Sequence, residues 1–190
     1  VEKHGGKFFD EHGNPQDAMA ILKENGFNYI RLRLWVDPKD ADGKPYGGGN
    51  NDLATTIELA KRAKASGMKF LLDYHYSDFW TDPARQNKPK AWASMNIDQL
   101  TEAVYQHTKT TMDAFAKAGV LPDMVQVGNE INNGMCGETD ASNVRKLLAS
   151  GSKAVRDAAT ASGKDILVAV HYTNIDDMKK LDTLLTGLQV

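Results

Sequence analysis

Short apolar runs alternate with longer amphipathic stretches along the chain, and this alternation limits the possible folds more than any other property of the sequence. Four of the runs have the length and residue types of buried β-strands, and each is followed by a stretch with helical periodicity. The predicted strands are residues 27–36, 68–76, 124–130 and 166–172. Strands that alternate with helices form parallel sheets with helical crossovers, so the sequence predicts an α/β fold.

Five stretches have helical periodicity and end near glycine or capping residues. Gly67, Gly119 and Gly163 each follow one of them, as glycine does when it terminates a helix. Ser142 is the expected capping residue before the fourth. The predicted helices are residues 18–24, 52–66, 97–118, 144–161 and 176–188.

The spacing of the strands separates two kinds of α/β fold. The strands start at residues 27, 68, 124 and 166, so consecutive starts are 41, 56 and 42 residues apart. Units of this length suit a (β/α)₈ barrel with elaborate loops better than a compact doubly wound sheet. Eight such units need far more than the 190 residues of this chain. We therefore expect a partial (β/α)₈ TIM barrel of four to five βα units, forming one incomplete domain over residues 1–190.

Composition excludes several classes of partner. The net charge is −2 and the pI is near 6.2, so the chain has no basic excess for nucleic acid or anionic membranes. No apolar run approaches the roughly 18 residues that a membrane span needs. The chain shows no signal-peptide pattern, but it begins with Val1, so its targeting stays open. A single cysteine, Cys136, cannot form an internal disulfide.

Polar residues gather at the carboxyl ends of the predicted strands, where (β/α)₈ barrels place their active sites. In the first strand Arg31 and Arg33 alternate with apolar residues and share one face with Trp35. The other three strands end in a histidine, in an amide beside a carboxylate, and in a histidine beside a tyrosine. These residues are His75, Asn129, Glu130, His171 and Tyr172.

Hydrogen-bonding side chains beside tryptophans suit a polyhydroxylated substrate, because flat indole rings pack under sugar faces while polar groups bind the hydroxyls. Trp35, Trp80 and Trp92 all lie at or just after strand ends. The pattern therefore predicts a carbohydrate site. The alternative for Trp92 is packing in the core, and for either strand arginine it is a structural ion pair.

A metal site is the competing interpretation of Asp73, His75 and Asp78, since histidine with nearby carboxylates is a ligand set. Alternation puts Asp73 and His75 on one face, but Asp78 lies beyond the strand, and no second closely spaced histidine or cysteine completes the set. A histidine that orients a substrate or a carboxylate is the favoured interpretation. Because the ligand set is incomplete, we expect no metal, and we expect no cofactor.

Other motifs fail on inspection. The segment 40–43 resembles part of a calcium loop, but Pro38 and Gly49 occupy the first and twelfth ligand positions. The glycine run 47–49 lacks the Gly-Lys-Ser/Thr of a phosphate loop. Cys136 has no base partner nearby in sequence and is interpreted as a bystander thiol.

Longer stretches of the sequence resemble glycoside hydrolase family 53, the endo-β-1,4-galactanases that cut the galactan side chains of pectin. The matching stretches are "YIRLRLWVDP", "YGGGNNDL", "LLDYHYSDFWTDPARQNKPKAW", "MVQVGNEINNGM", "AVRDA" and "ILVAVHYTN". They cover nearly the whole chain, and "HYSDFWTDP" together with "VGNE" is specific.

The resemblance implies a retaining glycosidase on a (β/α)₈ barrel, in which Asn-Glu ends the fourth barrel strand. It implies that Glu130 is the catalytic acid/base and that Asn129 binds the 2-hydroxyl of the sugar. It also implies that the glycone side is lined by Arg31, Arg33, His75, Trp80 and His171. We expect Asp78 and Trp92 to bind substrate as well. The same resemblance places the first barrel strand before Val1 and the nucleophile, a second glutamate on the seventh strand, after Val190.

Two functional alternatives stay open beside the galactanase. One is a related retaining glycosidase acting on another β-linked polysaccharide, and the other is a truncated sugar-binding or assembly module without catalysis. With its nucleophile missing, the chain by itself is expected to be inactive. An open half-barrel is also expected to self-associate or to bind a complementing chain. The family implies a secreted or cell-envelope location and no calcium site in this part of the chain.

Overall fold

The computed structural model describes residues 1–46, 51–174, 176 and 178–186. The glycine run 47–49 and the last part of the predicted helix 176–188 lie outside these residues. Within the described ranges the four predicted strands form one parallel sheet in the order β3-β4-β5-β6. The strands are β3 (Tyr29–Leu34), β4 (Lys69–Tyr74), β5 (Met124–Val127) and β6 (Leu167–Ala169). An α/β fold with parallel strands is confirmed.

Each strand is shorter than predicted. The sequence predicts that the third strand runs to Glu130, but β5 ends at Val127, and β6 ends at Ala169. The polar residues at the carboxyl ends leave the sheet and continue as irregular chain. The apolar character of the runs therefore predicted burial correctly but did not show where strand pairing stops.

The five predicted helices are all present, and most begin and end within two residues of the prediction. Asp17, Asp52, Asn96 and Asp140 each accept a hydrogen bond from a backbone N–H of the first turn. The expected cap Ser142 is wrong, because it lies inside the fourth helix and Asp140 takes that role. The helices are α1 (Ala18–Glu24), α2 (Leu53–Ala65), α3 (Ile97–Lys117), α4 (Ala141–Ser162) and α5 (Met178–Thr186).

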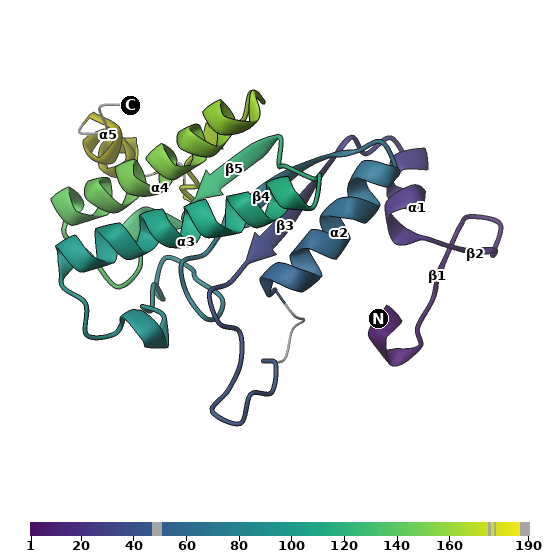
Figure 1. Ribbon diagram of the computed structural model, residues 1–190, viewed down its shortest axis with the longest axis horizontal. Helices are drawn as coiled ribbons and strands as arrows, with labels where there is room; N and C mark the ends of the chain where they lie inside the picture. Colours follow the sequence, from purple (N-terminus) through teal and green to yellow (C-terminus); the bar gives the residue numbers. More distant parts are fainter. Residues whose placement is uncertain (47–50, 175, 177, 187–190) are drawn as a thin grey trace.

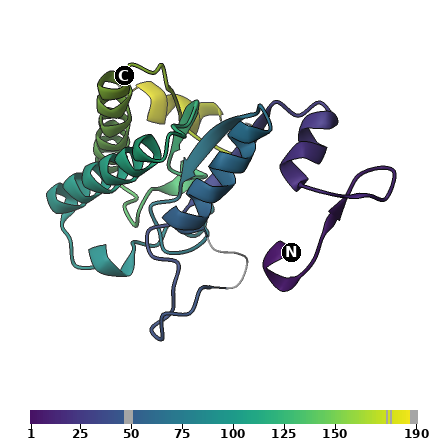
Figure 2. The same ribbon diagram turned by 45° about the vertical axis from the view of Figure 1, so that its right-hand side comes forward.

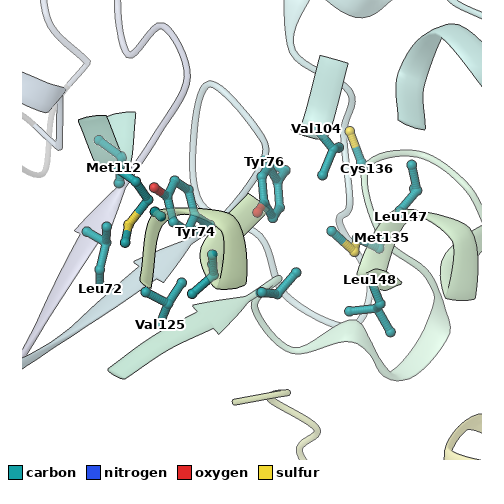
Figure 3. Packing of buried hydrophobic residues seen from close by; sticks show 14 of the residues in the cluster. Leu72, Tyr74, Tyr76, Val104, Met112, Val125, Met135, Cys136, Leu147 and Leu148 are labelled. Carbon is teal, nitrogen blue, oxygen red and sulfur yellow. The ribbon is translucent and has the colours of Figure 1, made fainter. Parts of the chain in front are cut away.

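Helices α2, α3 and α4 cover one face of the sheet (Figure 1). The strand residues on that face, including Phe70, Leu72 and Val125, are completely buried. Tyr74 and Tyr76 stack at 5.3 Å between ring centroids, and Figure 3 shows both among the aliphatic side chains of the core. Their hydroxyl groups lie 2.6 and 2.7 Å from threonine hydroxyls of α3, so these buried phenols are hydrogen-bonded.

The close packing of α4 depends on Gly151 in the middle of that helix. A Cβ at this position would lie 2.7 Å from Val127 Cγ1 and 2.8 Å from the Tyr76 hydroxyl. Glycine costs helix stability, but here it lets α4 approach the end of β5. That approach fixes the helix against the strand that directly precedes Asn129 and Glu130.

The opposite face of the sheet has a different character. Arg31 and Arg33 lie on it, while Leu32 and Leu34 point under the helices and are 6% and 1% exposed. This confirms the alternation predicted for the first strand. In register with Arg33 lie Asp73 and, on the next strand, Gln126. The four strands form an open sheet rather than a closed barrel in the part of the chain that the structure describes.

The first 17 residues lie to one side of the sheet, beyond α1 (Figures 1 and 2). They contain a one-turn 3₁₀ helix, η1 (Glu2–His4), and a hairpin of β1 (Phe8–Phe9) and β2 (Pro15–Gln16). Arg62 of α2 holds this segment through ion pairs to Glu2 and Asp17. Two further one-turn helices, η2 (Lys90–Trp92) and η3 (Ile131–Asn133), follow β4 and β5. None of the helices within the described residues is long and apolar enough to cross a membrane.

Candidate active site

A polar cavity of about 390 Å³ lies at the carboxyl ends of β3, β4 and β5. Five of the residues that line it were predicted from the sequence as site residues, and the other two, Thr81 and Asp82, were not. The lining residues are Arg31, Arg33, Trp80, Thr81, Asp82, Asn129 and Glu130. The strand-end prediction thus describes one shared site for these side chains.

The chain after β5 turns so that two consecutive residues reach the same cavity. In a regular strand, neighbouring side chains point to opposite faces, so Asn129 and Glu130 could not both line it. Gly128 has φ 83°, and Glu130 has φ 50° and ψ 52°, so both residues adopt left-handed backbone conformations. A non-glycine residue in that region costs about 1–3 kcal/mol. The strain at Glu130 is therefore part of how the site is built.

The side-chain amide of Asn129 has a defined orientation. Arg31 offers only donors, and its Nη2 donates to Asn129 Oδ1 at 2.6 Å. The amide nitrogen of Asn129 then points the other way and donates to the backbone carbonyl of Thr81 at 2.8 Å. Asn129 is 5% exposed, so its remaining N–H is directed by these two partners rather than by solvent.

Asp73 is the charged centre beneath the cavity. Its carboxylate is completely buried and lies 2.9 Å from Arg31 Nη2 and 3.2 Å from His75 Nε2. Gln126 donates to its other oxygen at 2.6 Å. A buried carboxylate is stable only when it is paired and hydrogen-bonded, and here the partners come from β3, from β5 and from the residue that follows β4. Arg31 therefore forms the structural ion pair that was its alternative interpretation, and it also lines the cavity.

His75 is buried below the cavity and acts through its neighbours. The backbone N–H of Thr81 donates to His75 Nδ1 at 3.1 Å, and the Thr81 hydroxyl lies 2.9 Å from the same nitrogen. A backbone N–H can only donate, so Nδ1 accepts and the ring proton lies on Nε2, facing Asp73. His75 thus links Asp73 to the Thr81 carbonyl that binds Asn129. It is 1% exposed and lies beneath the lining rather than in it.

His171 closes the far side of the site at the end of β6. Its Nδ1 lies 2.9 Å from Asn129 Oδ1 and 3.4 Å from the backbone nitrogen of Glu130. The shorter contact requires a proton on Nδ1, because an amide oxygen only accepts. Burial, and next the positive charge of Arg31, lower the pKa of His171 below its usual value. The ring is therefore held in its singly protonated form at neutral pH.

Trp80 and Arg33 form a stacked pair on the cavity wall. The Arg33 guanidinium carbon lies 4.2 Å from the Trp80 ring centroid. The edges of Trp35 and His75 approach the same indole at 5.7 and 5.8 Å. Burial, and next the charge of Arg31, lower the pKa of Arg33 below its usual value. These contacts fix the plane of the Trp80 ring before any ligand arrives.

Besides His75 and His171, two further predicted site residues do not line the cavity. Trp92 belongs to η2, is 7% exposed and packs in the core with its ring 5.8 Å from that of His107. The core alternative for Trp92 is therefore the one that its position supports. Asp78 is 8% exposed and accepts backbone hydrogen bonds from Asp37 at 3.0 Å and Lys90 at 2.8 Å, so it anchors two loops.

The side chains considered as metal ligands and the cysteine make other contacts in the structure. No group of three or more histidine, cysteine, aspartate or glutamate side chains with metal-binding geometry occurs among the described residues. Asp73 and His75 are instead engaged with arginine, glutamine and threonine. Cys136 is buried, and burial raises the pKa of its thiol to about 12, so it is not a reactive thiolate.

Several organising residues were not found from the sequence. Thr81 binds both His75 and Asn129, and Gln126 binds Asp73 from within a strand. Asp82 lines the cavity, but its Oδ1 accepts the backbone N–H of Ala84 at 2.8 Å. The one available signal was the uncharged polar Gln126 inside the apolar run of β5, since a buried amide needs partners. Thr81 and Asp82 lie on a loop, where polar residues are ordinary.

Comparison with known proteins gives a consistent result. The family model described as glycosyl hydrolase family 53 matches residues 1–189. An endo-beta-1,4-galactanase of Bacillus subtilis (strain 168) is 47% identical over 174 residues, which cover 92% of this chain and 40% of the relative. A probable arabinogalactan endo-beta-1,4-galactanase A of Aspergillus terreus is 44% identical over 161 residues, covering 83% of this chain and 44% of the relative.

Two solved structures are similar over nearly the whole chain. The Ignisphaera aggregans GH53 catalytic domain superimposes with a TM-score of 0.88 at 42% identity, covering 100% of this chain and 54% of that one. A fungal beta-1,4-galactanase superimposes with a TM-score of 0.87 at 32% identity, covering 98% and 54%. The chain thus spans about half of each solved structure and less than half of each galactanase named above. The open four-stranded sheet corresponds to a partial barrel.

Proposed function

Because the chain belongs to glycosyl hydrolase family 53, we propose that its protein is an endo-β-1,4-galactanase that hydrolyses the β-1,4-galactan side chains of pectin or type I arabinogalactan. The observation that carries the proposal is the turn after β5, which brings Asn129 and Glu130 together into one polar cavity. A carboxyl group beside an amide, an arginine pair and an indole matches the needs of a sugar substrate. A polymer of this kind also implies that the protein acts outside the cell or in its envelope.

Glu130 is the acid/base of a retaining mechanism in this proposal. Its carboxyl group protonates the glycosidic oxygen as the bond to the anomeric carbon breaks, and its carboxylate later takes a proton from the incoming water. Such a mechanism needs a second carboxylate about 5–5.5 Å away, which attacks the anomeric carbon. The nucleophile proposed for that role is a glutamate outside these 190 residues.

The neighbours of Glu130 bind the sugar in the same proposal. Asn129 uses one N–H on Thr81, so its second N–H is available for the sugar's 2-hydroxyl. Arg31 is committed to Asp73 and Asn129 and acts by fixing that amide. Trp80 supplies an apolar surface whose plane Arg33 sets. His75 and His171 hold this arrangement from below and from the side.

The test measures hydrolysis of galactan, mannan and xylan by the complete natural polypeptide. Hydrolysis of galactan with little release from mannan and xylan is the expected result, and no cleavage of galactan refutes the proposal. Cleavage of mannan or xylan in its place would favour the related glycosidase acting on another polysaccharide.

The Glu130→Gln variant tests the assigned role. It should lower kcat/KM on galactan by about 10²–10⁴-fold, the usual contribution of a general acid/base. Glu102→Gln, the same change at an exposed position of α3, is the matched control and should leave activity unchanged. Equal activity in both variants would remove Glu130 from the mechanism.

A second candidate function applies to residues 1–190 expressed alone. Glu130 and Asp82 are the acidic residues that line the cavity, and Asp82 is bound to its own loop. We therefore expect weak sugar binding without hydrolysis from this polypeptide. Hydrolysis that is lost in its Glu130→Gln variant would contradict both this expectation and the placing of the nucleophile outside these residues.

A further inference from the structure

Gln86 makes contacts that neither the sequence prediction nor the family comparison assigns. It lies on the loop between β4 and η2, away from the cavity lining. Its amide nitrogen donates to the backbone carbonyl of Asn129 at 2.8 Å and to that of Glu130 at 3.2 Å. The same nitrogen lies 3.1 Å from the carbonyl of Asp82 in its own loop. One side chain thus contacts the backbone of both consecutive residues of the site.

The orientation of the Gln86 amide follows from these contacts. Three carbonyl oxygens face Nε2, so the flipped amide would place Oε1 against three acceptors. In the present orientation Oε1 is buried and has no hydrogen-bond partner among the described residues. The Gln86 amide group therefore donates to the backbone of the site while its own oxygen stays without a hydrogen bond. Buried polar atoms without a partner are uncommon, so this orientation has a specific cause.

The carbonyls that Gln86 holds belong to a strained piece of backbone. Glu130 has φ 50°, a conformation in which an L-residue persists only when its surroundings fix it. The backbone N–H of Ile131, the next residue, donates to the carbonyl of His171 at 3.1 Å. Gln86 thus binds the carbonyls of Asn129 and Glu130, while His171 binds the N–H that follows them.

The loop that carries Gln86 is itself fixed. Asp82 and Arg85 exchange two backbone hydrogen bonds of 3.0 Å, which close a tight turn directly before Gln86. Asn133, after the Glu130 turn, donates to the Pro83 carbonyl at 2.8 Å. Two residues past Gln86, Lys88 pairs with Glu138 at 2.9 Å. Hydrogen bonds and an ion pair thus fix the loop that carries Gln86 against the segment that its amide contacts.

We propose that Gln86 is a positioning residue for the acid/base: its amide fixes the left-handed backbone at Glu130 and thereby aims the Glu130 carboxyl at the glycosidic oxygen. This inference rests on the proposed function of Glu130. Loss of the two donors would let the peptide of Glu130 relax and displace its carboxyl group. Protonation of the leaving oxygen is the step that suffers, because it depends on the placement of that group.

The test uses two substrates that differ in their need for an acid. Galactan has a poor leaving group that must be protonated, whereas a 2,4-dinitrophenyl β-galactobioside loses a phenolate that leaves without a proton. Gln86→Glu, of the same shape but without the donors, should lower kcat/KM on galactan about 10- to 100-fold and on the aryl substrate less than about 3-fold. Asn87→Asp, the same change at the exposed neighbour, is the matched control and should leave both values unchanged.

Glu130→Gln serves as the benchmark and separates the two levels of the proposal. If Glu130→Gln shows the substrate split and Gln86→Glu loses activity equally on both substrates or on neither, the positioning role of Gln86 is refuted while that of Glu130 stands. If Glu130→Gln shows no split, the acid/base assignment fails and the role of Gln86 fails with it. Gln86→Met, which has no charge, replaces Gln86→Glu if the latter does not fold, and the same split is required of it.

Discussion

Position 129 accepts an amide and no other common side chain, for reasons that lie in its two neighbours. Arg31 needs an acceptor from this side chain, and the carbonyl of Thr81 needs a donor. Glutamine has the same groups but one more methylene, and aspartate or leucine satisfies at most one partner. The two hydrogen bonds within the protein therefore require an amide at this position even without a substrate. They also fix the direction of its second N–H.

This leads to a prediction for Asn129→Asp. The carboxylate keeps the contact with Arg31 but faces the Thr81 carbonyl with a second acceptor and has no donor for a sugar hydroxyl. We expect kcat/KM on galactan to fall by about 10²-fold, as is typical when a group that positions a substrate is lost. Steady-state kinetics of the complete natural polypeptide measure this.

Asn25→Asp is the control for that variant. Asn25 also donates to a backbone carbonyl, that of Ile21, and the substitution changes the charge equally, but Asn25 is exposed at the end of α1 and does not line the cavity. Its kcat/KM should stay within about threefold of the wild type, in the range of ordinary surface substitutions. Equal losses in the two variants would mean that the added charge, and not the position of the amide, lowers the activity.

What the sequence predicts at the scale of residues depends on where a residue lies. Arg31, Asn129 and Glu130 were recognisable because a polar side chain at the end of an apolar run is costly unless it has a purpose. Thr81 and Gln86 lie in a polar loop, where nothing in the sequence distinguishes them. Their roles come from contacts with residues more than 40 positions away, such as Asn129.

At the scale of elements, α3 carries a largely buried histidine that the site does not use. The ring of His107 lies between Tyr74, Tyr76 and Trp92, with centroid distances of 5.9, 6.2 and 5.8 Å. Its Nε2 is buried without a hydrogen-bond partner among the described residues. Burial lowers the pKa of His107 from 6.5 to about 4. Helix α3 therefore packs against these three rings through an imidazole that is uncharged at neutral pH.

We predict a pH-dependent loss of stability from this packing. In the unfolded chain the imidazole takes up a proton near its usual pKa, whereas in the folded protein it does so only near pH 4. The folded state therefore loses stability as the pH falls from about 6.5 to about 4. The lowered pKa corresponds to about 3 kcal/mol of unfolding free energy. Denaturant unfolding measures the free energy of unfolding at pH 7 and at pH 4. Between these pH values the wild type should lose about 3 kcal/mol more than His107→Phe does.

His12→Phe is the control for that comparison. The side chain of His12 is 74% exposed, so its replacement should leave the pH dependence of the wild type intact. If His107→Phe shows the same loss of stability as the wild type between the two pH values, the buried imidazole is not its source.

Helices were easier to predict than strands for a physical reason. A helix is defined by local signals, and the residues Asp52 and Gly67 or Asn96 and Gly119 bracket α2 and α3 within a few positions. A strand ends where its partner ends, and the partner lies far away in the sequence. The ends of β5 and β6 were therefore predicted too late in the chain.

At the scale of the whole molecule, the helices that the structure describes cover one face of the sheet and leave the other uncovered. Leu71, Met124 and Leu167 lie side by side in register on the uncovered face. Leu167, on the edge strand β6, is 54% exposed. Nearby Val170 and Leu185 line a cavity of about 980 Å³ between β6 and α4. An apolar stripe that ends at an open strand edge favours association.

We therefore predict that a polypeptide of residues 1–190 alone self-associates. Sedimentation should give a mass above the 20.9 kDa of the monomer, and Leu167→Glu should shift the distribution toward the monomer. Phe9→Glu is the matched control, because Phe9 is also 54% exposed but lies on the hairpin away from the sheet. A stable monomer that unfolds cooperatively, or an equal effect of the two variants, would contradict this prediction.

The long spacing of the strands predicted a partial barrel correctly, because each long unit must contain both a helix and a loop that reaches the site. The first 17 residues gave no such signal. Their strands β1 and β2 contain two residues each, and Phe8 and Phe9 are 37% and 54% exposed, so no periodic pattern marks them.

The order of the strands in the sheet is the order in which they are synthesised, β3-β4-β5-β6. Each strand pairs with the one made just before it, so a partner already exists when it leaves the ribosome. We expect the sheet to grow one strand at a time during translation. The strands that carry Arg31 and Asp73 are then paired before Glu130 is added to the chain. Glu130, with its strained backbone, therefore folds against strands that are already in place.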